Sequence, residues 1–304
     1  MKTERGVQGR LDVMWSHVYA AIEAGHVVEP SQFEPGVPLE EQAHQHILDI
    51  DFYETLLRVA YGVLPVLDVT VEAPLRLTAV DATFLDSNGG ELRGFESIHH
   101  RDETLVGFAD PSIGVLWHAI RMTAASGHYL NVGASVGIPL GGTESDPFAA
   151  GAAGVRHQHM FFGYGVFTPR LEARYIYTSG SYRWGGWTKA RLALYESSRN
   201  YRPPGSYQLA LGGQYHTDWS GFWFGLEPRV MAETAARWES REAENSGRLD
   251  ISVAGMLGWS WGAGFNTSLS LQRMVTTFSA KGDQLELPWT LSLGLGWRGD
   301  VLSD

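Results

Sequence analysis

The side chains best suited to chemistry in this 304-residue chain are its histidines, which gather in a few polar stretches. Two pairs follow the pattern His-x-His, His44-Gln45-His46 and His157-Gln158-His159, which sets both imidazoles on one side of an extended backbone. Neutral imidazole is the usual nitrogen ligand of Zn²⁺ and Cu²⁺, so Cu or Zn is a candidate cofactor. The alternative is a set of solvated, pH-sensitive or structural histidines. The candidate metal ligands are His26, His44, His46, His99, His100, His157 and His159.

The segments that must position these histidines alternate between apolar and polar residues with a period of two, which indicates half-buried β-strands. In the last of them, Trp289, Leu291 and Leu293 share one face while Thr290 and Ser292 share the other. Twelve such segments run from end to end of the chain. They are Leu11–Glu23, Ile47–Val59, Val66–Val80, Pro111–Met122, Tyr129–Ile138, Pro169–Thr178, Tyr182–Tyr195, Ser206–His216, Gly221–Met231, Arg248–Trp261, Gly264–Met274 and Leu285–Trp297.

Two unequal kinds of connection join these strands, which favours a transmembrane barrel over a soluble sandwich. Short turns alternate with long polar connections, as in outer-membrane barrels that have one tight rim and one rim of extracellular loops. The long connections are expected at Ala24–His46, Asp81–Asp110, Pro139–Thr168, Ser197–Gly205, Ala232–Gly247 and Val275–Gln284. We therefore predict an all-β fold, an antiparallel up-and-down barrel of about twelve strands that forms a single domain over residues 1–304.

Aromatic residues cluster near the short turns, mostly on the apolar face of their strand. A ring of Trp and Tyr at one level is the interfacial girdle of a membrane barrel, whereas a sandwich core would scatter them along the strands. We expect Trp117, Trp184, Trp259 and Trp297 to point outward into lipid, with both termini on the short-turn side. The remaining girdle residues are Tyr61, Tyr175, Tyr177, Tyr215, Trp219 and Trp261.

Composition excludes several classes of protein. The net charge of −11, without a Lys/Arg run, argues against a nucleic-acid partner. The absence of Cys removes disulfides and thiolate sites. No apolar run reaches the length of a membrane helix. The stretch Met1–Arg10 lacks the apolar core of a signal peptide, so we expect a mature outer-membrane chain with an added Met1; the other interpretation is a cytoplasmic protein that never carried a signal.

The face opposite the apolar one carries charges of both signs, which in a barrel would line the lumen. Opposite charges can pair across the interior of a twelve-stranded barrel, so we expect a narrow or gated conduit. The roughly ten residues before the first strand are too few for a plug. The expected lumen residues are Asp68, Glu72, Arg76, Glu172, Arg174, Lys189, Arg191, Glu227 and Arg229.

Three stretches resemble the outer-membrane transporters of the MetA-pathway phenol-degradation family. They are the strand, turn and strand from Leu57 to Pro74, the run Gly107-Phe-Ala-Asp-Pro-Ser-Ile-Gly114, and the run from Gly133 to Gly142. The order matches the family's three motifs over roughly the first half of the chain, although Ala109-Asp110 stands where Gly-Asp is usual. The resemblance implies an outer-membrane barrel that passes a small molecule.

The expected function is therefore a channel or transporter for a small solute, in contact with the lipid bilayer and with a histidine-rich outer mouth that binds a transition metal. One alternative is a non-conducting barrel that presents its loops to a partner. A second is an outer-membrane hydrolase, which would need a hydroxyl and an imidazole side by side on the wall with a polar orienting group. Ser16 and His17 are adjacent and face opposite sides of their strand, so we expect no enzyme activity.

Overall fold

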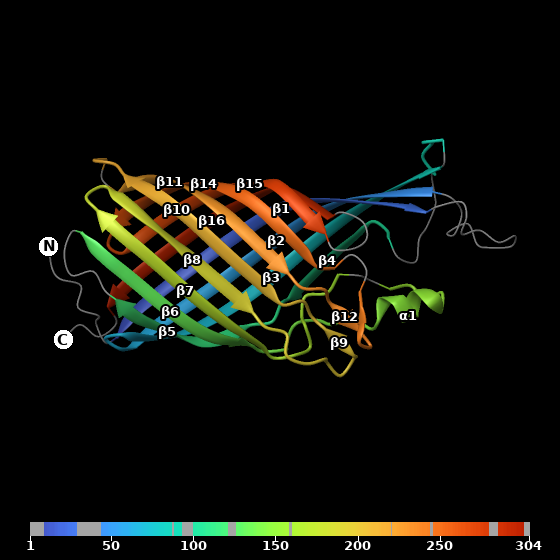
Figure 1. The fold of residues 1–304 in the computed structure, drawn as a ribbon, viewed down its shortest axis with the longest axis horizontal. Helices are drawn as coiled ribbons and strands as arrows, with labels where there is room; N and C mark the ends of the chain where they lie inside the picture. The colour runs from blue at the N-terminus through green and yellow to red at the C-terminus, as the bar shows by residue number, and fades with distance from the viewer. Residues whose placement is uncertain are drawn as a thin grey trace, which may run out of the picture.

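The computed structural model describes residues 9–28, 44–86, 88–92, 100–120, 126–157, 160–219, 221–243, 246–279 and 285–300, which form a closed antiparallel barrel of twelve strands (Figure 1). Neighbours in sequence pair with one another, and the first strand pairs with the last in a register that sets Arg10 opposite Asp300. The strands of the wall are β1 (Arg10–Val28), β2 (His44–Leu64), β3 (Leu67–Asp86), β4 (Glu103–Phe108), β5 (Ser112–Ile120), β6 (Gly127–Gly137), β7 (Thr168–Ser179), β8 (Tyr182–Arg191), β10 (Ser206–His216), β11 (Phe222–Glu233), β14 (Arg248–Gly262), β15 (Phe265–Ser279) and β16 (Leu285–Asp300).

The strands β4 and β5 pair with successive stretches of β3 and together make one of the twelve. They are separated at Ala109–Pro111 because proline has no backbone N–H to give to the strand ladder. All twelve predicted strands are present, so the predicted all-β antiparallel barrel is confirmed. No helix in the described part of the chain is long and apolar enough to cross a membrane.

The alternation along each strand separates a lipid-facing exterior from a polar interior. In β3, Asp68 and Thr70 are 2% and 7% exposed, whereas Val71 and Leu75 are 47% and 39% exposed. Apolar side chains that would be buried in a soluble sandwich lie on the outside here, which only contact with lipid makes favourable.

The predicted aromatic girdle lies at the end of the barrel that carries the short turns. Trp117 and Trp184 point outward and are 50% and 56% exposed. Trp259 and Trp297 are partly covered by neighbouring rings, with ring centroids 5.6 Å from Trp261 and 6.4 Å from Phe265. Each of the two shares its strand face with exposed leucines, so both also lie on the outer wall. The strands β1 and β16 begin and end at the same rim, next to the turn after Gly62.

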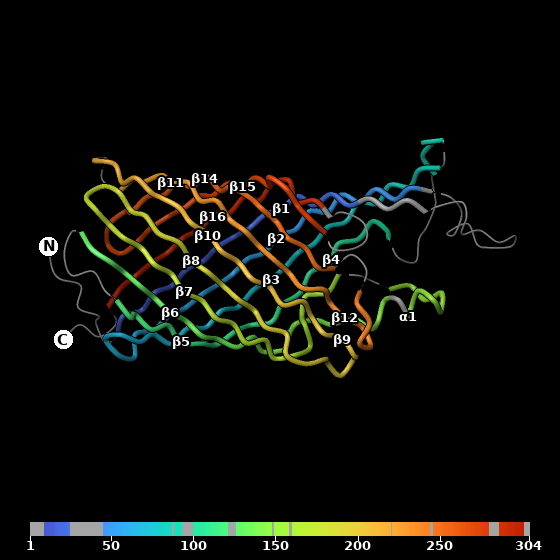
Figure 2. Tube along the Cα trace, viewed as in Figure 1, coloured from blue at the N-terminus to red at the C-terminus, as the bar shows by residue number. Residues whose placement is uncertain are grey.

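The first three strands are longer than predicted and extend beyond the opposite rim (Figure 2). Both predicted ends of the loop Ala24–His46 were wrong, because β1 continues to Val28 and β2 starts at His44. Pairing on both sides of β2 satisfies the backbone outside the bilayer. On the inner face of the extension Phe84 and its register partner His46 are each 6% exposed. His26, His44 and His46 therefore lie in strands and not in a loop.

The other long connections also contain secondary structure that alternation could not indicate. The loop predicted at Asp81–Asp110 holds the end of β3 and all of β4, and Pro139–Thr168 contains the short helix α1 (Pro147–Ala152). The connections after β8 and β11 supply a small sheet that lies beside the outer mouth (Figure 1). It consists of β9 (Tyr201–Arg202), β12 (Arg237–Trp238) and β13 (Arg241–Glu242).

Candidate functional site

The lumen is the candidate site, because the polar faces of all twelve strands converge there. The strand alternation places every residue of the predicted lumen set on the inner side of the wall: Asp68, Glu72, Arg76, Glu172, Arg174, Lys189, Arg191, Glu227 and Arg229. Whether these side chains act in transport stays a prediction.

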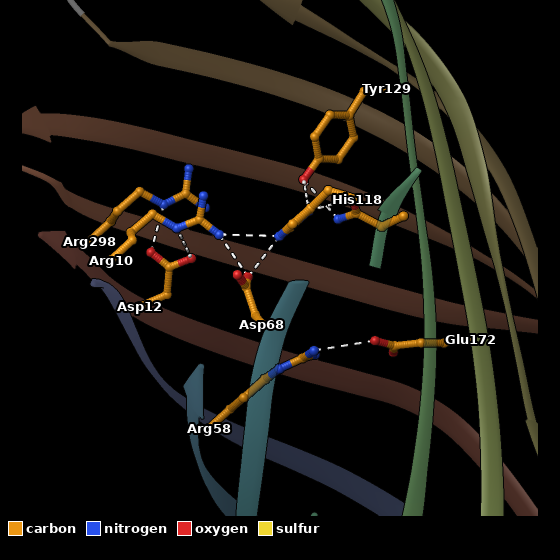
Figure 3. A network of polar contacts seen from close by, with 9 residues as sticks. Arg10, Asp12, Arg58, Asp68, His118, Tyr129, Glu172 and Arg298 are labelled. Atoms are coloured by element: carbon orange, nitrogen blue, oxygen red, sulfur yellow. Dashed lines mark hydrogen bonds and ion pairs between the residues drawn. The ribbon is translucent and has the colours of Figure 1, made fainter. Parts of the chain in front are cut away.

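A buried network closes part of the lumen near the short turns (Figure 3). Asp68 on β3 accepts hydrogen bonds from Arg10 on β1 at 2.7 Å and from His118 on β5 at 2.8 Å. The other ring nitrogen of His118 lies 2.8 Å from Oδ1 of Asn131, whose amide donates to Tyr129. Arg10 balances the charge of the Asp68 carboxylate, which is almost fully buried, and His118 links this ion pair to Asn131 and Tyr129.

A second group of charges crosses the middle of the lumen. Arg58 on β2 reaches Glu172 on β7 at 3.2 Å, although three wall strands separate them (Figure 3). Arg58 also lies 3.6 Å from Glu72, which is 3.7 Å from Arg170 on β7. These contacts join strands that are not neighbours in the wall, so the side chains must extend across the interior. The predicted pairing of lumen charges is therefore present, whereas the narrow or gated conduit stays a prediction.

On the described strands of the barrel body the inward-facing carboxylates are all paired, whereas the cations Arg174 and Lys189 are not. Each of the carboxylates has a guanidinium nitrogen within 3.6 Å. Arg174 and Lys189 make no ion pair with any residue that the structure describes; Lys189 lies 5.5 Å from the ring of Trp187. The paired carboxylates are Asp12, Glu54, Asp68, Glu72, Glu172, Glu227, Glu233 and Asp250.

The long connection between β6 and β7 folds toward the lumen and is held by Asp110. This carboxylate is 2% exposed and accepts hydrogen bonds from the backbone N–H groups of Gly141 and Tyr164, each at 2.9 Å. Gly141 packs so closely that an added Cβ would lie 2.7 Å from the Cα of Gly163. Two of the motifs behind the family resemblance, around Asp110 and Gly141, thus meet at one contact that latches this connection to the wall.

The latched connection forms a cap over part of the mouth, together with the connections after β8 and β11. Tyr201 and Trp238 are 8% and 6% exposed, with ring centroids 4.6 Å apart, and Phe161 packs edge-on against Tyr201 at 4.9 Å. Burial raises the pKa of the Tyr201 phenol, so this ring stays neutral. The cap is a small folded core and not a set of independent loops.

A cavity lies between the cap and the inner wall. Phe162 and Tyr164 of the cap line one side. On the other side Arg76 donates to Glu54 at 2.7 Å, and Arg191 lies under the ring of Tyr164 with its guanidinium carbon 4.5 Å from the ring centroid. Arg191 also donates to the Tyr164 hydroxyl. The Arg191 guanidinium therefore helps to hold the cap in place through its contacts with Tyr164.

The predicted metal ligands are only partly described. His99 and His159 lie outside the described residues, and for His26 and His44 only the backbone is described. His46 is 6% exposed and its ring centroid lies 5.1 Å from that of His100. His26 is the direct partner of His46 in the β1–β2 register, and the carbonyl of His157 accepts a hydrogen bond from Arg101 at 3.2 Å. Among the described side chains, no three His, Asp or Glu residues are grouped to hold a metal, so this site stays a prediction.

Imidazoles pair with hydroxyls on the outer wall at His17 and at His128, which lies 2.6 Å from the Tyr175 hydroxyl. His17 on β1 lies 2.9 Å from the hydroxyl of Thr55 and is stacked on Trp15 at 6.0 Å between ring centroids. Within the described part of the chain no carboxylate hydrogen-bonds to His17, so the orienting group that a catalytic histidine uses is missing from this pair. The expectation that the chain is not an enzyme stays a prediction.

Sequence analysis missed several residues that shape the lumen and its mouth. Arg10 and Arg58 lie on the inner face at positions that the alternation itself indicates, whereas His118, also on the inner face, was expected there. Asp110 was recognised only as part of a motif, and Tyr164 lies in a connection without periodicity. The inner-face residues could have been found by extending the alternation, whereas the cap residues had no signal of that kind.

No protein-family model and no curated protein matches the sequence. Among solved structures, the barrel is similar to an outer-membrane channel from Pseudomonas putida F1, with a TM-score of 0.61 and 13% identity over 96% of this chain and 96% of that chain. The fold is that of a bacterial outer-membrane β-barrel. At this identity the likeness concerns the fold alone.

Two further matches score lower. The CymD monoaromatic hydrocarbon channel has a TM-score of 0.38 and 9% identity over 97% of this chain and 89% of that one. LpxR from Salmonella typhimurium has a TM-score of 0.40 and 8% identity over 94% and 99% of the two chains. Scores of this size carry no argument about what this chain does.

Proposed function

We propose that this chain is an outer-membrane channel through which a small solute passes along a narrow, ion-paired lumen. The proposal is supported by a closed barrel whose outer face is apolar and whose inner face carries charged and polar side chains. Contact with lipid requires an apolar outer face, and a water-filled passage requires polar side chains on the inner face.

The contact that carries the proposal is the Arg58–Glu172 pair across the lumen. A barrel that only presented loops to a partner would fill its interior with packed side chains. Here the interior holds an ion pair at 3.2 Å between β2 and β7, and the two side chains are 21% and 31% exposed. Charges that keep this much contact with solvent lie in a hydrated space.

The test removes this cross-lumen contact. Substitution Arg58→Ala is expected to raise the single-channel conductance in a planar bilayer, because it releases Glu172 and deletes a long side chain from the narrow part of the lumen. The matched control is Arg273→Ala, since Arg273 lies outside the lumen with its guanidinium carbon 4.5 Å from the Trp289 ring centroid. If the wild-type barrel passes neither ions nor solutes into liposomes, the non-conducting binding barrel becomes the better interpretation.

A separate observation supports a second proposal, that the outer mouth binds Zn²⁺ or Cu²⁺ through histidine. Two imidazoles that share one tetrahedral metal, with metal–nitrogen bonds of about 2.0–2.1 Å, have ring centres about 5 Å apart. The rings of His46 and His100 are 5.1 Å apart. His26 is the backbone partner of His46 in the β1–β2 register, and it stays the predicted third ligand.

Calorimetry with Zn²⁺ and with Cu²⁺ tests this second proposal. The double variant His46→Ala/His100→Ala is expected to lose binding, whereas His128→Ala, at the girdle beside Tyr175, is expected to keep it. Affinity should fall as the pH drops through about 6, because a protonated imidazole cannot coordinate a metal. Equal, weak binding by the wild type and the double variant would refute the site.

A further inference from the structure

We infer that the lumen favours small anions over cations, and that it suits an organic solute with a carboxylate and an apolar body. This inference rests on the proposed channel function and names its solute class. It starts from an imbalance inside the barrel. The chain as a whole carries a net charge of −11, yet the charges left without an ion-pair partner on the described strands of the inner wall are positive.

The first step is the pairing of the lumen charges. Every inward carboxylate on the described strands of the barrel body is held by a guanidinium, so its field is largely neutralised within the wall. Asp110, between β4 and β5, instead accepts two backbone hydrogen bonds. Arg174 and Lys189 face the lumen, are exposed there, and make no ion pair with the described residues. A narrow passage with low-dielectric walls focuses the field of such charges and raises the local concentration of anions.

The second step is where the two cations lie. They are on neighbouring strands, with Arg174 opposite Trp187 and Lys189 opposite Glu172 in the β7–β8 register. Glu172 does not cancel Lys189, because its carboxylate is already 3.2 Å from Arg58. The two positive side chains therefore form one patch on a single side of the lumen.

The third step is the surface around this patch. The wall is hollowed between β7, β8 and β10, where Gly185 and Gly212 contribute no side chains. Arg174, Trp187 and Met256 line the hollow together with Glu227, whose carboxylate is 2.7 Å from Arg229. A guanidinium can bind a carboxylate through two parallel hydrogen bonds, and an indole and a thioether provide apolar surface for the body of the same molecule. An inorganic anion would interact with the guanidinium only and not with the apolar surface.

The test measures reversal potentials of single channels in a planar bilayer under a salt gradient. The wild-type protein is expected to be more permeable to the anion than to K⁺ in potassium chloride and in potassium benzoate. The double variant Arg174→Gln/Lys189→Gln should lose several-fold of this preference, and Arg174→Glu/Lys189→Glu should reverse it. The control Arg273→Gln removes a charge from the outer wall, so it should leave the reversal potential unchanged.

The second measurement separates the effect of the solute's charge from the effect of its shape. Benzamide resembles benzoate but carries no charge, so its entry into liposomes should not depend on Arg174 and Lys189, whereas benzoate entry should fall in the double variant. A variant whose gel mobility no longer changes on heating has failed to fold. In that case the single variant Lys189→Gln is measured in place of the double variant. A wild-type protein that passes nothing overturns the channel function itself. A conducting protein whose selectivity the variants leave unaltered, or that prefers K⁺, overturns this inference alone.

Discussion

Substitution of Asp110 by Asn should release the cap while leaving the barrel closed. The Asp110 carboxylate accepts two backbone hydrogen bonds, from Gly141 and Tyr164, at 2.9 Å each. Asn keeps nearly the same shape and one acceptor oxygen, but sets an NH₂ group against the second N–H. A hydrogen bond to a charged group contributes about 1.5–3 kcal/mol, so loss of one and weakening of the other should cost about 2–3 kcal/mol. At about 1.4 kcal/mol per factor of ten, the open state of the cap becomes roughly 30- to 150-fold more populated.

Hydrogen exchange of the folded barrel in micelles measures this change directly. Peptides that contain Gly141 and Tyr164 should exchange faster by the same factor, whereas the strands of the wall should keep their protection. Single-channel conductance should rise as well, because Tyr164 and Phe162 line the cavity beneath the cap. Asp218→Asn, on an exposed turn at the opposite rim, serves as the control. Unchanged exchange at Gly141 and Tyr164 in the Asp110→Asn protein would refute the latch.

Three further substitutions test the described contacts. Asp68→Asn removes one member of a buried ion pair, at a cost of about 3–5 kcal/mol, so its unfolding in urea should begin at lower concentration than that of Asp218→Asn. Trp238→Ala should cost about 3–5 kcal/mol and abolish the near-ultraviolet circular dichroism of the cap while the far-ultraviolet signal persists; retention of both signals would count against a packed cap. Leu75→Arg, on the lipid-facing side of β3, should cost about 2–4 kcal/mol in folding into vesicles, whereas Leu140→Arg in an exposed connection should cost far less; equal costs would argue against the assigned outer face.

The sequence by itself determined the barrel and its two faces. The reason is that strand alternation is local: Val71 and Leu75 alternate with Thr70 and Glu72 whatever the rest of the chain does. The unequal lengths of the connections and the aromatic residues at one rim, such as Trp117 and Trp184, added the orientation in the membrane. These features depend on neighbours in sequence and on the solvent at each level.

Only the tertiary structure decided which inner-face charges meet. Arg58 and Glu172 are 114 residues apart, and their contact depends on the curvature of the wall between β2 and β7. The same holds for the latch at Asp110, which joins a break in one strand to a connection with no periodic pattern. Alternation also could not show that β1 and β2 continue past the bilayer, because their outer ends are stabilised by pairing with each other and with β3 and by burial of His46 and Phe84, and not by lipid. The alternation shows on which face of the sheet a side chain lies, whereas closure of the barrel decides which residue it contacts.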